Sequence, residues 1–218
     1  MWDIDGTLIR GNGSGRIAMN RAFERLYGVK EVFSNMYLAG SLDFNTIQTA
    51  FSKYKISLDE FDTYLETYYD ELRFVLLEGR SELLPGVADI LEETAINDEL
   101  YNALGTGNVE LGARIKLEEF HLNPYFPVGG FSDRPMERFE MIFHGISKAR
   151  EYYQIDFREE EVFIIGDTVR DFEAGVRCNV KTISVATGGN LFDELQEVNP
   201  SRVLKDLSDK AKFFELIS

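Results

Sequence analysis

Two short, continuously apolar runs in the second half of the chain constrain its fold most strongly. Residues 162–165 (VFII) are followed by Gly166 and Asp167, and residues 180–189 (VKTISVATGG) have the same form. A continuous apolar run that ends in a turn is typical of a strand buried on both faces of a parallel sheet. These runs therefore predict a parallel sheet that helices cover on both sides.

The segments around these runs alternate between helical and extended patterns. Helices are predicted over residues 87–93, 109–120 and 137–153, and further strands at residues 100–108 and near residues 126–133. Strands that alternate with helices indicate a parallel sheet built from βαβ units, so the predicted fold class is α/β.

An all-helical segment interrupts this pattern early in the chain. Residues 16–80 carry apolar stripes at helical spacing, and Ser14 and Gly28 are predicted to cap the first helix at its two ends. The clearest stripe consists of Phe61, Tyr64, Leu65, Tyr68, Tyr69, Leu72, Val75 and Leu76. A stripe of this kind normally packs into a helical core.

These patterns predict two domains. A helical cap domain is expected over residues 13–81, inserted into a catalytic core domain of residues 1–12 and 82–218. The joints are expected at residues 10–15 and 78–86, because both segments contain glycine and are mostly polar, as hinges can be.

Composition restricts the possible partners and the compartment. The chain of 218 residues has a formal net charge of -15, which would repel nucleic acid, so no nucleic-acid partner is expected. No apolar run approaches the ~20 residues of a membrane span. The acidic start does not resemble a signal peptide, and Cys178 is the only cysteine. We therefore expect a cytoplasmic protein without a membrane anchor, whereas its oligomeric state is not encoded in any recognisable pattern.

Polar side chains gather at the ends of four predicted strands. The groups are Asp3 with Asp5, Thr106 with Gly107 and Asn108, Asp133 with Arg134, and Asp167 with Asp171. Ligands of open parallel sheets bind beyond the carboxyl ends of the strands, so these groups are expected to converge. Neighbouring carboxylates need a cation or a proton between them, and oxygen ligands suit Mg²⁺. Alone, Asp167 could simply cap the helix that follows it.

Three of these polar groups can bind phosphate. Thr106 and the backbone of Gly107 and Asn108 can hold phosphate oxygens, and Arg134 can neutralise a phosphoryl group. Lys148 is the competing cation, but its mid-helix position favours a solvated face. Contacts to the rest of a substrate are expected from polar residues near the joints: Arg10, Asn12, Arg16, Ser41 and Asn45.

Taken in order, DIDGT, Thr106, Arg134 and GDTVRD resemble the four motifs of the haloacid dehalogenase superfamily. The helical insert resembles the cap of its phosphoglycolate phosphatase and β-phosphoglucomutase branch. The resemblance implies a doubly wound, Rossmann-like core with a cap inserted after the first strand. It also implies Mg²⁺-dependent phosphoryl transfer through an aspartyl phosphate.

The resemblance assigns a role to each motif residue. Asp3 would be the nucleophile, and Asp5 would protonate the leaving oxygen and later deprotonate water. The Asp3 carboxylate, the backbone around Asp5, and Asp167 would hold Mg²⁺ with support from Asp171. Thr106 and Arg134 would bind the phosphoryl oxygens.

The expected function is hydrolysis of a phosphate monoester of a small metabolite, as in a phosphoglycolate phosphatase. A sugar phosphomutase and a non-catalytic relative that binds a partner are the alternatives. The sequence departs from the pattern of this family in two places. Only Met1 and Trp2 precede Asp3, where a full strand is expected. Arg134 stands where many relatives carry lysine.

Overall fold

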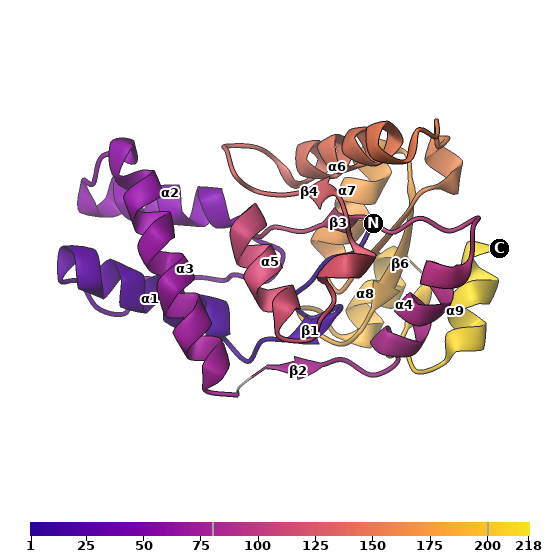
Figure 1. The fold of residues 1–218 in the computed structure, drawn as a ribbon, viewed down its shortest axis with the longest axis horizontal. Coiled ribbons are helices and arrows are strands. Elements are labelled where there is room, and N and C mark those ends of the chain that lie inside the picture. The colour runs from indigo at the N-terminus through magenta and orange to yellow at the C-terminus, as the bar shows by residue number, and fades with distance from the viewer. Residues whose placement is uncertain (80, 200) are drawn as a thin grey trace.

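The structure, a computed structural model, describes residues 1–79, 81–199 and 201–218. A helical lobe lies at one end of the molecule, and a parallel sheet with its covering helices forms the rest (Figure 1). The α/β fold class is therefore confirmed.

Every pair in the main sheet is parallel. Its strands are β3 (Leu104–Gly105), β4 (Gly129–Gly130), β5 (Phe163–Gly166), β6 (Lys181–Val185) and β7 (Val203–Leu204). Trp2 bridges both Leu104 and Ile165, so the order across the sheet is β4, β3, the first residues, β5, β6 and β7. The chain order changes direction beside the first residues, which is where open α/β sheets bind their ligands.

The segment before Asp3 is short but paired on both sides. The Trp2 amide donates a hydrogen bond to the Ala103 carbonyl at 2.8 Å, and the Asp3 amide donates one to Ile165 at 2.9 Å. The Trp2 ring stacks on Phe213, with 5.6 Å between ring centroids. These contacts fix the backbone of Asp3 between β3 and β5.

Helices cover both faces of the sheet. The helices of the core are α4 (Val87–Ile96), α5 (Glu110–Glu118), α6 (Arg138–Tyr153), α7 (Val169–Cys178), α8 (Phe192–Val198) and α9 (Lys210–Ile217). Successive strand residues point to opposite faces. Trp2 and Ile165 accordingly pack with α4, α5 and α9, whereas Met1 and Ile164 pack with α6 and α7.

The helical lobe has its own apolar cluster. It contains α1 (Ser14–Tyr27), α2 (Asp43–Tyr54) and α3 (Phe61–Leu77), and Phe23, Tyr64 and Tyr68 are fully buried in it. The antiparallel strands β1 (Ile9–Arg10) and β2 (Glu82–Leu83) pair where the chain enters and leaves the lobe. The domain division at residues 13–81 stays a prediction, and Arg80 of the second predicted joint lies outside the described residues.

The ends of the first helix differ partly from the prediction. Gly28 closes α1 in the left-handed conformation, with φ of 70°, as predicted. At the other end Gly13 occupies the cap position, and Ser14 is the first helical residue. Ser14 therefore does not cap α1, and its buried hydroxyl has no hydrogen-bond partner within residues 1–79, 81–199 and 201–218.

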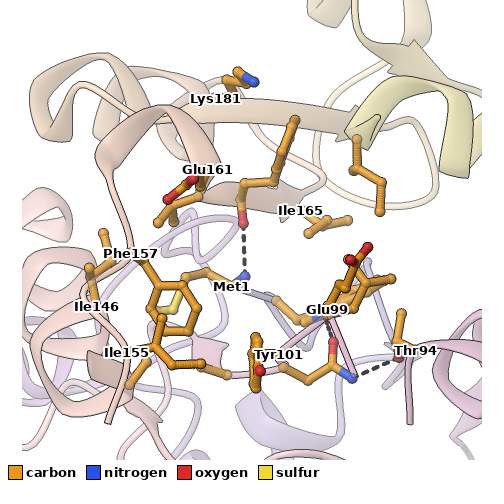
Figure 2. A pocket seen from close by; sticks show the side chains of 18 of the residues that line it. Met1, Thr94, Glu99, Tyr101, Ile146, Ile155, Phe157, Glu161, Ile165 and Lys181 are labelled. Atoms are coloured by element: carbon orange, nitrogen blue, oxygen red, sulfur yellow. Dashed lines mark hydrogen bonds between the residues drawn. The ribbon is translucent and has the colours of Figure 1, made fainter. Parts of the chain in front are cut away.

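A cavity of about 630 Å³ lies beside Met1, at the end of the strands away from the predicted site (Figure 2). Apolar side chains such as Ile146, Ile155 and Phe157 line it, and the Met1 nitrogen donates to the Phe163 carbonyl at 2.8 Å. Within the described parts of the chain, none of the helices combines the length and the apolar character that a membrane crossing requires.

Replacing Trp2 by alanine should lower the free energy of unfolding by about 3–5 kcal/mol, because it leaves a cavity in the centre of the core. Urea unfolding followed by circular dichroism measures this, since Trp2 is the only tryptophan. The exposed Phe143 supplies the control, and Phe143→Ala should cost less than about 0.5 kcal/mol. Equal costs for the two variants would contradict the placement of Trp2.

Candidate active site

A cavity of about 460 Å³ lies between the helical lobe and the carboxyl ends of the strands. The core contributes Asp3, Asp5, Asn108 and Asp167 to its lining, together with backbone at Gly107. The helical lobe and its joints contribute predicted residues as well: Arg10, Asn12, Arg16 and Ser41. The structure thus gathers residues from both ends of the sequence around one space.

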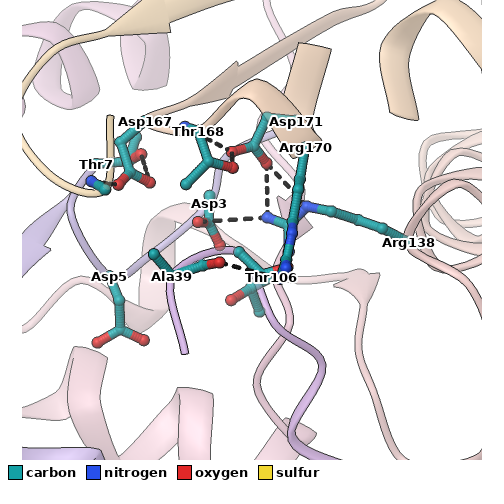
Figure 3. A network of polar contacts seen from close by, with 12 residues as sticks. Asp3, Asp5, Thr7, Ala39, Thr106, Arg138, Asp167, Thr168, Arg170 and Asp171 are labelled. Atoms are coloured by element: carbon teal, nitrogen blue, oxygen red, sulfur yellow. Dashed lines mark hydrogen bonds and ion pairs between the residues drawn. The ribbon is translucent and has the colours of Figure 1, made fainter. Parts of the chain in front are cut away.

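Three buried carboxylates meet at the edge of this cavity. Asp3, Asp167 and Asp171 each offer an oxygen, and these three oxygens lie within 4.8 Å of one another. Figure 3 shows Asp3 converging with Asp167 and Asp171, which come from the end of β5 and the first turn of α7, while the Asp5 side chain points away from the group. The three residues are 5%, 3% and 0% exposed, so solvent screens their charges little.

Local backbone geometry places these carboxylates. Asp3 and Asp167 each follow a residue of the sheet, and Asp171 lies in the first turn of α7, where its Oδ2 accepts a hydrogen bond from the Thr168 hydroxyl at 2.6 Å. Gly6 has a φ of 86°, and a Cβ there would overlap Oδ2 of Asp167. Glycine at this position therefore lets the first loop turn close against the Asp167 carboxylate.

Arg138 is the cation that reaches the carboxylates. Its guanidinium lies 2.6 Å from Oδ1 of Asp171 and 3.4 Å from Oδ2 of Asp3, and its side chain is 9% exposed. Burial opposes its charge, but Asp171 and Asp3 together raise the pKa of Arg138 above its usual value. Arg138 is the first residue of α6, where the helix dipole disfavours a cation, so the carboxylates must supply the stabilisation.

Arg134, the cation predicted for this position, lies elsewhere. It is exposed, its guanidinium contacts His144, and it is not among the residues that line the cavity. The competing candidate, Lys148, lies over the ring of Phe131. The prediction preferred Arg134 in the strand-end loop to Lys148 in mid-helix, whereas the guanidinium beside the carboxylates is that of Arg138, four residues after Arg134.

Burial and mutual repulsion raise the pKa values of the carboxylates. Burial raises the pKa of Asp3 to about 7; Arg138 opposes this shift, whereas Asp171 and Asp5 add to it. Burial, with Asp3 and Asp171, also raises the pKa of Asp167 well above its usual range. One guanidinium beside three carboxylates leaves two negative charges without a partner when all three are ionised.

Asp5 belongs to a separate hydrogen-bonded group. Its Oδ2 accepts hydrogen bonds from Lys116 at 2.6 Å and from Asn108 at 2.8 Å, and Lys116 also donates to Asn108 at 2.7 Å. The Asp5 carboxylate is therefore not part of the three-carboxylate group, and the binding of Mg²⁺ by the backbone around Asp5 stays a prediction. Its Oδ1 has no hydrogen-bond partner among the described residues and stays available to a ligand.

Lys116 was not predicted as a site residue. It lies on the buried face of α5 with Ala113 and Leu117, and it is 4% exposed. A lysine on an apolar helix face needs a partner, because an unpaired buried ammonium is costly. That pattern was the available signal in the sequence, but nothing in it identifies Asp5 as the partner.

The predicted polar group of Thr106, Gly107 and Asn108 lies next to Asp5. Thr106 is fully buried, and its hydroxyl accepts a hydrogen bond from the Asn108 side chain at 2.8 Å. A Cβ on Gly107 would overlap the Ser41 carbonyl, so this glycine allows the lobe to approach the core closely. Gly107 and Asn108 line the cavity. Thr106 is not among its lining residues and contacts Asn108 through the hydrogen bond of its hydroxyl.

The remaining predicted residues lie at varying distances from the carboxylates. Arg10 pairs with Glu82 across β1 and β2, and Arg16 donates to the Met36 carbonyl at 2.9 Å. Asn45 is exposed, donates to the Met136 carbonyl at 2.9 Å, and lines a different hollow. Asn45 therefore does not line the cavity that the other predicted contact residues line.

The carboxylate group fits a divalent cation. Its ligands are oxygens, which suit Mg²⁺, and its two uncompensated charges would be neutralised by one such ion. Arg138 and Thr168 already occupy both oxygens of Asp171. The Gly189 amide donates to Oδ2 of Asp167, but the contact of Oδ1 of Asp167 with Thr7 is 3.5 Å long, and that of Asp3 with Arg138 is 3.4 Å long. Asp3 and Asp167 are thus the residues best placed to ligate directly, with Asp171 holding Arg138.

A comparison with family models identifies the family of this chain. Residues 1–185 match the family model described as haloacid dehalogenase-like hydrolase. A hydrolase from Pseudomonas syringae has a TM-score of 0.70 at 19% identity, with 100% of this chain and 97% of that one covered. No match was found among curated proteins.

Two further solved structures carry more specific descriptions. A putative beta-phosphoglucomutase from Thermotoga maritima has a TM-score of 0.65 at 19% identity and covers 100% of this chain and 98% of its own. A predicted phosphoglycolate phosphatase from Haemophilus somnus has a TM-score of 0.66 at 17% identity, covering 98% and 96%. At these identities the likeness establishes the fold.

The stability of the metal-free protein should fall as pH rises from about 4 to about 7. Asp3 has a folded-state pKa of about 7 against 3.8 unfolded, so its contribution is complete below pH 4 and lost by pH 7. Mg²⁺ at about 100 times its Kd should raise Tm by about 5–10 °C near pH 7.5 and by less near pH 5.

Thermal unfolding with and without Mg²⁺ at both pH values measures this difference. Asp167→Asn should remove most of the Mg²⁺-dependent rise, while Asp133→Asn, a carboxylate outside the group, should keep it. The same rise in all three proteins would place the cation elsewhere.

Proposed function

The chain belongs to the haloacid dehalogenase-like hydrolases, and from this we propose that it is a Mg²⁺-dependent phosphatase of small-metabolite phosphate monoesters. The observation that carries the proposal is the buried Asp3 carboxylate beside Arg138 and Asp167, at the edge of the cavity. The size of the cavity, about 460 Å³, suits a small metabolite.

In the first step, an oxygen of Asp3 attacks phosphorus and the bond to the leaving oxygen breaks. Asp5 gives its proton to that oxygen through Oδ1, because Lys116 and Asn108 hold Oδ2. The products are an aspartyl phosphate on Asp3 and a free alcohol. Dividing one difficult displacement into two steps is the advantage of such an intermediate.

In the second step, a water molecule attacks the aspartyl phosphate and gives a proton to the Asp5 carboxylate. The bond between phosphorus and Asp3 breaks, which restores both carboxyl groups and releases inorganic phosphate. Arg138 supplies a fixed positive charge for the phosphoryl oxygens, with backbone donors at Gly107 and Asn108. A bound Mg²⁺ would reduce the repulsion between the anionic nucleophile and the anionic phosphate.

Among the possible substrates, phosphoglycolate is the starting hypothesis, because the sequence resembles that branch. A sugar phosphomutase uses the same pair of aspartates, and the Thermotoga maritima neighbour keeps this alternative open. Incubation with a sugar phosphate and its bisphosphate separates the two: inorganic phosphate indicates a phosphatase, and isomerisation indicates a mutase.

Asp3→Asn should abolish phosphate release from para-nitrophenyl phosphate in the presence of Mg²⁺ without unfolding the protein. In the wild type, hydroxylamine should convert the intermediate to a hydroxamate at Asp3, which peptide mass spectrometry detects. Retained activity in Asp3→Asn, or a hydroxamate at another aspartate, would show that the nucleophile is misassigned. A wild type without any turnover would favour the non-catalytic alternative.

Arg138→Met should lower kcat/KM for phosphate release by about 10²–10³, because it removes the positive charge beside Asp3. It should also destabilise the protein by about 3–5 kcal/mol, since two buried carboxylates lose their partner. The matched control is Arg134→Met, which removes an exposed arginine four residues away and should change kcat/KM less than about two-fold. Equal losses in the two variants would contradict the assignment of Arg138.

A further inference from the structure

Two buried hydroxyl groups in the active-site cavity have no hydrogen-bond partner. Tyr68 of α3 is 0% exposed and Ser14 of α1 is 1% exposed, and both line the cavity. Neither the Tyr68 hydroxyl nor the Ser14 hydroxyl has a partner among the described residues. Leaving a buried polar group unpaired costs about 1–3 kcal/mol, so a ligand that forms a hydrogen bond with each hydroxyl would remove that cost.

Both hydroxyls lie close to the groups that surround Asp5. A Cβ on Gly15 would lie 3.4 Å from Nζ of Lys116 and 3.9 Å from the Tyr68 hydroxyl. A Cβ on Gly11 would lie 3.0 Å from Oγ of Ser14 and 3.3 Å from Oδ1 of Asp5. The two glycines thus leave open the space between these polar atoms.

Asp43, the first residue of α2, adds a second carboxylate to this region. It lines the cavity, and one oxygen accepts a hydrogen bond from the Val109 amide at 3.1 Å. Burial raises the pKa of Asp43 to about 6 and Lys116 opposes that shift, so the group is mostly ionised at neutral pH. When Asp5 carries the proton that it gives to the leaving oxygen, the charges of Lys116 and Asp43 offset each other.

This charge balance distinguishes two kinds of substrate. A carboxylate on the leaving group can only accept hydrogen bonds, and the ionised Asp43 would repel it at short range. A hydroxyl can instead donate to Asp5 or Asp43 and accept from Lys116, Tyr68 or Ser14. The mixture of donors and acceptors therefore favours a neutral, hydroxyl-bearing partner.

We propose that Ser14, Tyr68 and Lys116, with Asp43, form a leaving-group subsite that binds the hydroxyl groups of a polyol or sugar. The proposal rests on the proposed phosphatase function, because the subsite surrounds the acid that protonates the leaving oxygen. It makes polyol phosphates, rather than phosphoglycolate, the preferred substrates. Tyr68 and Ser14 are its specificity-determining residues, whereas Lys116 also holds Asp5 and so affects every substrate.

The test compares three esters by released phosphate: glycerol phosphate, phosphoglycolate of similar size, and para-nitrophenyl phosphate, whose leaving group has no further hydroxyl. The wild type should show a higher kcat/KM for glycerol phosphate than for phosphoglycolate. Tyr68→Phe and Ser14→Ala should each lower kcat/KM for glycerol phosphate about five- to ten-fold, mainly through KM. Both variants should change the value for para-nitrophenyl phosphate less than about two-fold.

Tyr27→Phe is the matched control. The Tyr27 hydroxyl is also buried without a partner, but Tyr27 is not among the residues that line the cavity. This variant should leave the kinetics with all three esters unchanged, and the Tm of Tyr68→Phe should be equal to or above that of the wild type. Gly15→Ala, which suits a helix but fills the open space, should reproduce the loss for glycerol phosphate.

Several outcomes would overturn the subsite. These are a preference for phosphoglycolate, an unchanged KM for glycerol phosphate in Tyr68→Phe, or equal losses with all three esters. If the wild type releases no phosphate even from para-nitrophenyl phosphate, the proposed phosphatase function fails instead. Calorimetric binding of glycerol phosphate then decides on the subsite: a Kd about five-fold weaker in Tyr68→Phe than in Tyr27→Phe supports it, and equal values overturn it.

Discussion

The repulsion among three buried carboxylates is the constraint on which the site depends. Asp3, Asp167 and Asp171 meet where solvent screens them little, and one guanidinium, that of Arg138, offsets a single charge. Such an arrangement lowers stability unless a cation or protons complete it. A divalent cation bound by these carboxylates would supply the positive charge that Arg138 alone does not.

The sequence allowed the convergence of the motifs to be predicted, because parallel strands end at a common edge. Asp3, Asp167 and Asp171 meet as this rule requires, and helices such as α6 begin and end within a few residues of their predicted bounds. The sequence did not identify Arg138, because the path of the loop before α6 decides whether Arg134 or Arg138 faces the carboxylates. The contact of Lys116 with Asp5 joins residues 111 positions apart, and no local pattern encodes it.

The helical lobe contributes side-chain hydroxyl groups to the cavity. The strand ends supply carboxylates and backbone donors, whereas α1 and α3 bring hydroxyl groups over the same cavity. Close approach is possible because Gly107 has no side chain beneath the Ser41 carbonyl. In the proposed function the core would therefore supply the reacting groups, and the lobe would supply hydroxyl contacts that select the leaving group.

A crystal structure grown with Mg²⁺ and beryllium fluoride, an analogue of the phosphoryl group, tests the central claim most directly. We expect a trifluoroberyllate bonded to an oxygen of Asp3 and within reach of Arg138, with Mg²⁺ ligated by Asp3 and Asp167. Density for the fluoride on another residue, or a cation bound away from these two carboxylates, would contradict it.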